Sequence, residues 1–367
     1  MDELRPPIQR IERLTPLAEV LARVDADVRP VFARELPVAQ AAGRILAEHV
    51  RAGPHPRQAL ALRDGFAIRS EETNDAGSYA PAPLSLAARV EFGDLLPSGT
   101  DAVASLDAVD HCAQPPQALA AVSPGEGVLA AGQDVGPDTP LLSAGHTLHS
   151  VDLAILAALG IERVPVRLPT FRLLAARTDA VASAITALLT SLIAPQAIVE
   201  EYKAIDAQAL DARKADALVI VGGSGSGEHD DSVRALARAG RVCAHGIGLS
   251  PGETSAFGFI GSAPVLIVPG RLDAALSVWH IVGARILARL AARADAAATR
   301  EAKLARKIAS TVGLVEFVPV RADGDALIPL ATSYLPWRAL THATGYVLVP
   351  AQSEGFAAGA VVTVAPL

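Results

Sequence analysis

The sequence predicts a multidomain protein of the α/β plus β class. Three observations lead to this prediction. The chain has 367 residues, which is too long for one ordinary core. Strand-like and helix-like segments alternate over 167–298, as is typical of a mostly parallel sheet with helices on both faces. Short β-like runs separated by Pro and Gly fill 51–136 and 299–367.

The first 50 residues have helical periodicity. Apolar positions recur at helical spacing over 7–24 and again over 36–50. A further helix is expected at 150–160, ending at Gly160, and an extended segment follows at 162–169. These regions predict one discontinuous helical domain, interrupted by the first β-rich stretch. The predicted domain bounds are 1–50 with 137–166, then 51–136, 167–298 and 299–367.

Strands and helices are predicted in turn along the alternating region, 167–298. Residues 180–199 carry no charge and are long enough to span a bilayer, but Pro195 interrupts them and strand-like segments flank them. A buried helix followed by a buried strand explains this stretch better than a membrane span. The predicted strands are 171–176, 197–202 and 217–221, and the predicted helices are 180–193, 206–214, 231–239 and 272–293.

Composition limits the classes of partner. The formal net charge is −7 and no block of Lys or Arg occurs, which argues against nucleic acid. The two cysteines, Cys112 and Cys243, lie far apart without metal-ligand spacing, as expected in the cytoplasm. The charged N-terminus lacks the apolar core of a secretory signal. We therefore expect a cytoplasmic protein with no membrane partner.

A glycine-rich loop after the strand at 217–221 is the candidate ligand site. Four glycines fall within six residues, and Asp230 and Asp231 stand where the next helix begins. Backbone N–H groups in such a turn can hold a phosphate, although the spacing matches neither common nucleotide fingerprint. Carboxylates repel phosphate unless a divalent cation lies between them, so the acidic residues indicate Mg²⁺. A solvated acidic helix cap is the alternative interpretation.

Four motifs occur in one order along the chain. They are DGFAIRS at 64–70, LPSGTDAVASLD at 96–107, GGSGSGEHD at 222–230, and PGETSAFG at 251–258 followed by VPG at 268–270. Together they resemble the MoeA-type molybdopterin molybdenumtransferases, which are related to the C-terminal domain of gephyrin. The resemblance covers nearly the whole chain.

The resemblance implies a fold of four regions: a helical domain, a small β domain, a molybdopterin-binding three-layer α/β domain and a C-terminal β-barrel. It implies a reaction on adenylated molybdopterin and molybdate. The phosphoanhydride is broken and molybdenum is left on the dithiolene, with a divalent cation, Mg²⁺, helping. It also implies a homodimer, and a molybdoenzyme or another cofactor-biosynthesis protein as a possible partner.

The resemblance also assigns roles to residues of this chain. Asp64 and Asp230 are expected to be catalytic and to bind the metal. His229 stands in the same loop, where it is either a proton-transfer group or an exposed residue beside the cap. The expected ligand-binding residues are Gly222, Gly223, Ser224, Ser226, Gly227, Ser250, Pro251, Gly252, Pro269, Gly270 and Arg271.

Departures from the family pattern leave two functions open. Ser250 and Glu253 stand where the family has lysines, and cations beside a pyrophosphate contribute much of the stabilisation in such transfers. Arg177 and Arg271 are either replacements or ordinary loop residues. One hypothesis is a molybdenumtransferase. The other is a non-catalytic protein on the same fold that binds the pterin or helps a molybdoenzyme mature. Trp279 and Trp337 are predicted to be core or interface residues.

Overall fold

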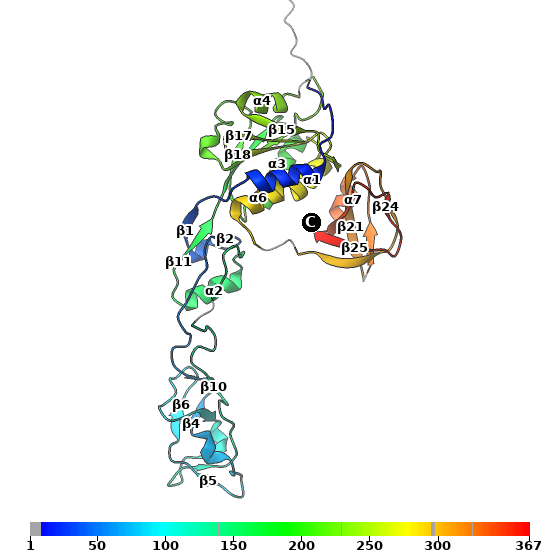
Figure 1. Cartoon of the computed structure of the whole chain (residues 1–367). Coiled ribbons are helices and arrows are strands. Elements are labelled where there is room, and N and C mark those ends of the chain that lie inside the picture. The colour runs from blue at the N-terminus through cyan, green and yellow to red at the C-terminus, as the bar shows by residue number, and fades with distance from the viewer. Residues whose placement is uncertain (1–8, 138–139, 229, 295–297, 325) are drawn as a thin grey trace, which may run out of the picture. The chain divides into compact units, whose positions relative to one another are not determined.

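The computed structural model describes residues 9–137, 140–228, 230–294, 298–324 and 326–367. The chain divides into two compact units (Figure 1). The first contains 1–48 and 144–367, and the second contains 49–143. The finer division into four domains stays a prediction.

A six-stranded sheet forms the centre of the first unit. Its parallel strands bring their carboxyl ends to one edge, where ligands of such folds bind. The sheet is mixed: β18 and β17 pair antiparallel, as do β17 and β15, while the other three pairings are parallel. In spatial order the strands are β13 (Ile198–Tyr202), β12 (Thr170–Ala175), β14 (Ala217–Val221), β18 (Ala263–Val268), β17 (Ala256–Ile260) and β15 (Arg241–His245).

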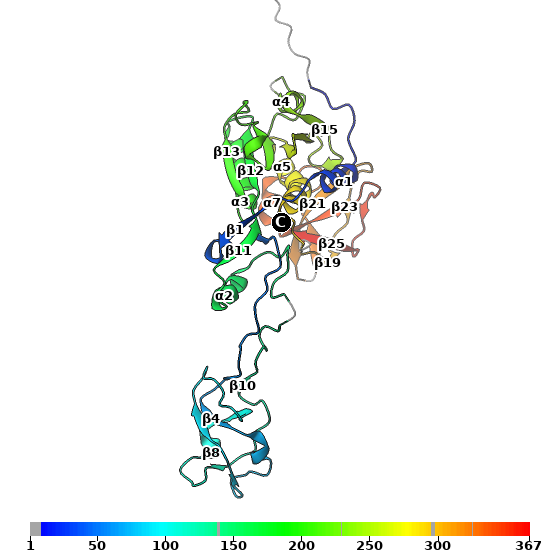
Figure 2. The same cartoon turned by 60° about the vertical axis from the view of Figure 1, so that its left-hand side comes forward.

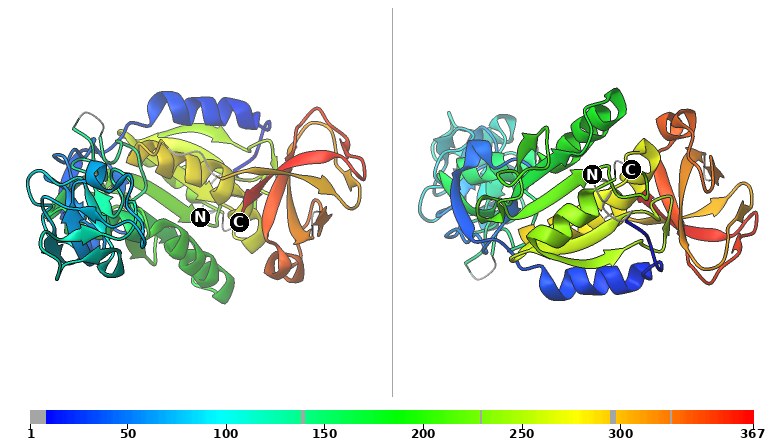
Figure 3. Two further views of the ribbon diagram at one scale, coloured as in Figure 1. Left: turned by 90° about the horizontal axis from the view of Figure 1, so that it is seen from below. Right: turned by 90° about the horizontal axis from the view of Figure 1, so that it is seen from above.

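Helices cover both faces of this sheet, which confirms the three-layer α/β prediction. Helices α1 (Leu17–Asp27), α3 (Ala180–Ile193) and α6 (Ala284–Ala291) lie side by side over one face (Figure 3). Their apolar residues share one core with Phe171, Val219 and other side chains of that face. Helix α4 (Ser232–Ala239) packs on the opposite face, on residues such as Leu218 and Ile220.

The two apolar segments that resemble membrane spans are core elements. The uncharged stretch 180–199 forms α3 and leads into β13, as the sequence predicts. The predicted helix at 272–293 is α5 (Leu272–Val278), a π-helical segment (Trp279–Gly283) and α6 in succession. Within the described chain, 272–291 is the helix long and apolar enough to cross a membrane, but 67% of its most apolar window is buried.

The C-terminal region closes into a five-stranded barrel, as predicted. The order is β21 (Val315–Asp323), β22 (Ala326–Pro329), β19 (Arg300–Leu304), β25 (Val361–Pro366) and β23 (Gly345–Val349), and β23 pairs back to β21 (Figure 2). Strand β16 (Leu249–Ser250) pairs with β21 and so ties the barrel to the α/β region. The remaining elements here are α7 (Trp337–His342), β20 (Ile308–Ala309) and β24 (Gly355–Phe356).

The helix expected at 36–50 is wrong. This stretch ends β1 (Ala33–Pro37), passes through a 3₁₀ turn at Val38–Gln40 and continues into β2 (Ile45–Leu46). Both strands pair with β11 (Arg163–Arg167), and both residues of β2 are fully buried. Pro37 favours extended backbone at Leu36, and Ile45 and Leu46 are buried by pairing with β11 instead of along a helix face. The helix expected at 150–160 is present as α2 (Ser150–Ala158).

Two other predicted helices differ from the structure. In the stretch 7–24, residues 7 and 8 lie outside the described residues, and the helix begins only at Leu17. The stretch 206–214 is a loop with a 3₁₀ turn at its end, Ala212–Lys214. The buried Arg172 explains this loop, because its guanidinium donates to the carbonyls of Gln208 and Asp211 at 3.2 and 2.8 Å. The loop conformation thus gives a buried guanidinium two of the acceptors that it needs.

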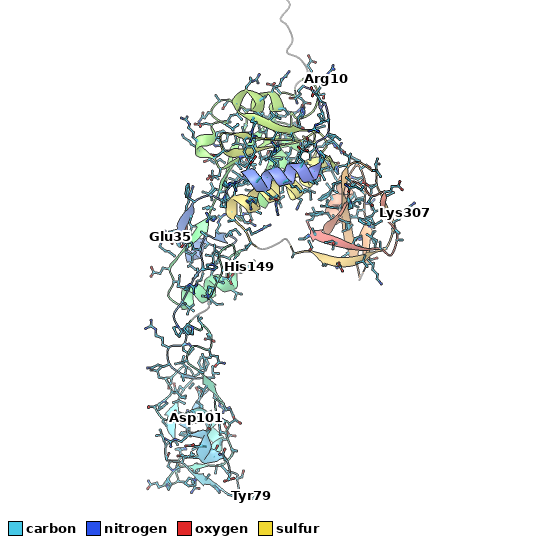
Figure 4. All side chains as sticks on the ribbon, in the orientation of Figure 1. Arg10, Glu35, Tyr79, Asp101, His149 and Lys307 are labelled. Carbon is cyan, nitrogen blue, oxygen red and sulfur yellow. The ribbon has the colours of Figure 1, made fainter. Side chains whose placement is uncertain are left out.

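The second unit is built from short strands around a small core. The exposed Asp101 holds the buried Ser70 by accepting from its backbone N and its hydroxyl, at 2.7 and 2.6 Å (Figure 4). The exposed ring of Tyr79 lies near β5. The strands are β3 (Leu60–Ala61), β4 (Gly65–Ile68), β5 (Ala82–Pro83), β6 (Ala88–Val90), β7 (Ala102–Ala104), β8 (Val109–Asp110), β9 (Gln117–Ala118) and β10 (Val128–Leu129).

Candidate functional site

A cavity of about 920 Å³ lies in the first unit where β12, β14 and β18 end. This volume is in the range of sites that hold a drug-sized ligand or cofactor. Glycine-rich loops, the start of α3, and the aromatic side chains of Tyr334 and Trp337 line it. The cavity is therefore at the edge of the sheet where the sequence places a ligand.

Two glycines make the floor of the cavity. Gly222 and Gly223 have φ values of +85° and +69°, which side chains other than glycine rarely adopt. A Cβ on Gly223 would lie 2.2 Å from the hydroxyl of Ser232, and this hydroxyl donates to the carbonyl of Gly222 at 2.8 Å. A Cβ on Gly270 would stand 3.7 Å from Gly222 Cα. The backbone is thus left accessible to a ligand.

Asp230 closes the glycine loop. Its Oδ2 accepts the backbone N–H of Gly227 at 2.9 Å, and its own N–H donates to the Gly227 carbonyl at 3.1 Å. Ser224 is buried within the loop, and its hydroxyl lies 3.2 Å from that of Thr254. These contacts hold the loop in one conformation before any ligand binds.

The N-terminal segment holds the same loop from outside. The Gln9 amide Nε2 donates to the carbonyls of Gly223 and Gly225 at 2.9 and 2.6 Å, although 214 residues separate Gln9 from Gly223. Gln9 is buried, and Thr15 of the same segment bridges to Ile247. One side chain from a distant segment thus occupies two carbonyls of the glycine loop that lines the cavity.

Two Arg–Asp pairs stand at the helix starts beside the cavity. Arg177 Nε lies 2.9 Å from Asp179 Oδ2, and Asp179 caps α3 by accepting from Ala182. The bond from Ala182 N–H and the Arg177 guanidinium keep the pKa of Asp179 below its usual value. Arg271 binds the buried Asp273 through two bonds, at 3.1 and 2.6 Å.

The pair at Arg271 is the more tightly held of the two. The hydrogen bonds to Asp273 raise the pKa of Arg271, and the nearby carboxylate of Glu253 adds to this shift. The guanidinium also lies 5.4 Å from the centre of the Tyr334 ring. Arg271 is therefore positioned for an anion but already shares its charge with Asp273.

The donor set fits a divalent cation shared with phosphate oxygens. Asp230 is on the cavity wall, and its Oδ1 is left for a ligand as far as the described residues go. Within the described ranges no group of three or more His, Cys, Asp or Glu side chains gathers into an all-protein metal site. Mg²⁺ usually takes one or two carboxylates plus phosphate oxygens, so one carboxylate suits it here.

The structure gathers only part of the predicted site at the cavity. Gly222, Gly223, Ser224, Asp230, Pro269, Gly270 and Arg271 line it. Ser226 and Gly227 belong to the same loop but do not line the cavity. Ser250, Pro251 and Gly252 do not line it either, although Thr254, which follows them closely in sequence, does. Asp64 lies in the second unit, where its Oδ1 accepts from the backbone N of Phe92 at 2.8 Å. His229 lies outside the described residues.

Several lining residues were not in the predicted set. Thr254, Asp179 and Asp273 each follow a predicted loop residue by a short distance, so sequence proximity could have indicated them. Tyr334 and Trp337 come from the segment between β22 and β23, and no local pattern in the sequence indicates that this segment reaches the cavity. Trp279 is buried in the core as predicted, whereas the Trp337 side chain is 60% exposed.

Comparisons with known proteins cover most of the chain. Residues 15–160 match the family model "MoeA N-terminal region (domain I and II)", and residues 170–289 match "Probable molybdopterin binding domain". The chain is similar to a molybdopterin biosynthesis protein of Methanocaldococcus jannaschii, with 25% identity over 90% of this chain and 91% of that protein. Molybdopterin molybdenumtransferase 2 of Mycobacterium tuberculosis is 24% identical over 71% of this chain and 75% of its own.

A solved structure shares the fold. The molybdopterin biosynthesis MoeA protein of Pyrococcus horikoshii OT3 superposes with a TM-score of 0.77 and 23% identity, over 97% of this chain and 100% of that one. The match to the second family model falls on the sheet and loops that form the cavity. The chain belongs to the MoeA-type family.

Proposed function

We propose that the protein acts in molybdenum cofactor biosynthesis as a molybdopterin molybdenumtransferase, with adenylated molybdopterin and molybdate as substrates. One observation carries this proposal. The region that matches the molybdopterin-binding model, 170–289, supplies the strand ends and loops around the 920 Å³ cavity. The named relatives support the same assignment.

The cavity residues suit the diphosphate of an adenylated substrate. The N-terminal residues of α3 line the cavity, and a helix N-terminus favours an anion through its N–H groups and dipole. Arg177 and Arg271 can each offer a guanidinium to phosphate oxygens. In this proposal the glycine floor lets the diphosphate approach the backbone closely. These groups bind and orient the phosphoanhydride.

The charge balance of the cavity supports a requirement for Mg²⁺. Asp179, Asp230 and Asp273 line the cavity with only two arginines, so carboxylates outnumber guanidinium groups by one. Asp230 would hold the ion, and a bound Mg²⁺ would neutralise charge on the diphosphate. Asp64 stays a proposed second ligand on the strength of its motif alone.

The two arginines are proposed to replace the lysines that the family carries at Ser250 and Glu253. Both arginines line the cavity, whereas Ser250 does not. Arg271 can rearrange its bidentate contact with Asp273 to share its charge with a phosphate. A homodimer, a cytoplasmic location and a partner among molybdoenzymes or cofactor-biosynthesis proteins complete the proposal.

Complementation tests the enzymatic assignment. Expression of the chain in a bacterium that lacks its own molybdenum insertase should restore molybdoenzyme activity. Calorimetry with adenylated molybdopterin should show binding in the same preparation. Binding without complementation would leave a pterin-binding protein and remove the transferase. Neither binding nor complementation would leave only the fold.

The Asp230→Ala variant tests the metal. The variant should lose the part of the ligand affinity that depends on Mg²⁺, because the carboxylate proposed to hold the ion is gone. Asp231→Ala is the matched control, since Asp231 instead pairs with Arg234 and Arg238 at 2.6 and 2.8 Å. An Asp230 variant whose affinity equals that of the wild type both in the presence and in the absence of Mg²⁺ would argue against a metal at this loop.

A further inference from the structure

The barrel contributes an aromatic wall to the cavity. Tyr334 and Trp337 both line it, and their side chains are 59% and 60% exposed. Trp is highly buried on average in proteins, and neighbouring exposed aromatic rings that line a cavity are typical of a surface that binds a ligand or a partner. We call this pair the aromatic wall.

The segment that carries the aromatic wall is firmly held. Leu335 between the two rings is fully buried in the main core. Two buried carboxylates bind the backbone on either side of Tyr334: Glu316 accepts from Ser333 N at 2.6 Å, and Asp273 accepts from Leu335 N at 3.3 Å. Buried carboxylates are costly unless they are hydrogen-bonded, so they fix the wall in place.

Arg271 connects the aromatic wall to the phosphate region. Its guanidinium covers the Tyr334 ring at 5.4 Å and also lines the cavity next to Gly270. That contact occupies part of the Tyr334 surface, whereas Trp337 has no such cation contact among the described residues. A ligand with phosphates at the glycine floor would therefore have its ring system within the same cavity as the aromatic wall.

We propose that Trp337, supported by Tyr334, stacks on a planar heteroaromatic ring of the bound ligand and so selects for a ring-bearing phosphate compound over a simple phosphate. The inference rests on the proposed function, which supplies two such rings, the pterin and the adenine. Stacking on an aromatic side chain accepts either ring, because both have a π-face.

The test compares ligands with and without a ring. Calorimetry uses AMP, a pterin carboxylate without adenine, and inorganic pyrophosphate as probes on the full chain. Trp337→Leu should weaken binding of whichever ring stacks on Trp337, the adenine of AMP or the pterin, by about tenfold or more. Pyrophosphate affinity should not change. Trp337→Phe, which keeps a ring, should retain most of the wild-type affinity, and circular dichroism checks the fold of both variants.

Fluorescence gives a second, independent readout. The chain has two tryptophans, and Trp279 is 3% exposed. A stacked ring should quench the exposed Trp337, and this signal should be absent in Trp337→Phe. A response to AMP alone identifies adenine as the stacked ring, and a response to the pterin alone identifies the pterin.

Each of the following outcomes would overturn the inference. Trp337→Leu could bind the ring-bearing probes with wild-type affinity, or lose pyrophosphate affinity equally. Sedimentation could instead show that Trp337→Leu only dissociates a dimer, which would make the wall an interface between copies. If the wild type and Trp337→Leu both complement and bind the ring-bearing probes with equal affinity, the stacking inference is wrong and the proposed function stands. Failure of the wild type to bind any ring-bearing probe or to complement would remove both.

Discussion

Substitution of the two floor glycines separates backbone strain from a side-chain clash. Gly222→Ala and Gly223→Ala both place a Cβ at positive φ, which costs about 1–2 kcal/mol. At Gly222 the nearest atom to the new Cβ is 3.8 Å away, an ordinary contact. At Gly223 the new Cβ meets the Ser232 hydroxyl at 2.2 Å and must displace it.

The displaced hydroxyl sets the expected difference between the variants. Ser232 would lose its bond to the Gly222 carbonyl, which is buried, and an unsatisfied buried group costs about 1–3 kcal/mol. We therefore expect Gly223→Ala to lower the free energy of unfolding by about 1–3 kcal/mol more than Gly222→Ala. The double variant Gly223→Ala/Ser232→Ala should cost less than the sum of its single variants.

Urea unfolding measures this difference. Fluorescence of the buried Trp279 reports on the α/β region when Trp337 is replaced by Phe in every variant. The slope of free energy against urea should stay constant, so that midpoints can be compared. Equal midpoints for Gly222→Ala and Gly223→Ala would show that the hydroxyl moves away without cost, and the reasoning about the packed floor would be refuted.

Four further outcomes are expected. Burial lowers the pKa of His280 from 6.5 to about 4, so the unfolded chain binds a proton first as the pH falls. The free energy of unfolding, followed by thermal unfolding, should therefore fall by up to about 3 kcal/mol between pH 6.5 and 4. The His280→Leu variant should not show this pH dependence. Arg172→Ala should lower the free energy of unfolding by about 3 kcal/mol in urea, because two loop carbonyls lose a charged donor; an unchanged midpoint would contradict this. Gln9→Ala should weaken pyrophosphate binding about tenfold in calorimetry, since the glycine loop loses both its outer bonds. Glu253→Gln should tighten pyrophosphate binding about threefold by removing an anion near Arg271, and weaker binding would count against that anion.

The sequence predicted best where one pattern determined one element. The uncharged run 180–193 forms a helix with the predicted bounds, because Asp179 caps its start and Pro195 follows its end. The apolar run 217–221 is a fully buried strand, because its continuous apolar residues suit a strand that is covered on both faces. The closed barrel and the three layers followed from the family resemblance, and the structure confirms them.

Long-range contacts decided where prediction failed. The stretch 206–214 has helical spacing, but Arg172 from a distant strand takes its carbonyls. The stretch 36–50 pairs with β11, more than 100 residues away, and local periodicity contains no information on that partner. The aromatic wall was missed for the same reason, since the pairing of β16 with β21 and the bond from Leu335 N–H to Asp273 join segments that are distant in sequence.

Asp273 makes two parts of the cavity energetically dependent on each other. One carboxylate accepts both bonds from Arg271 and the backbone N–H of Leu335. A phosphate that draws Arg271 away would alter the charge that holds the segment of the aromatic wall. Phosphate binding and ring binding should therefore be thermodynamically linked, and their free energies should not simply add when both parts of one ligand are present.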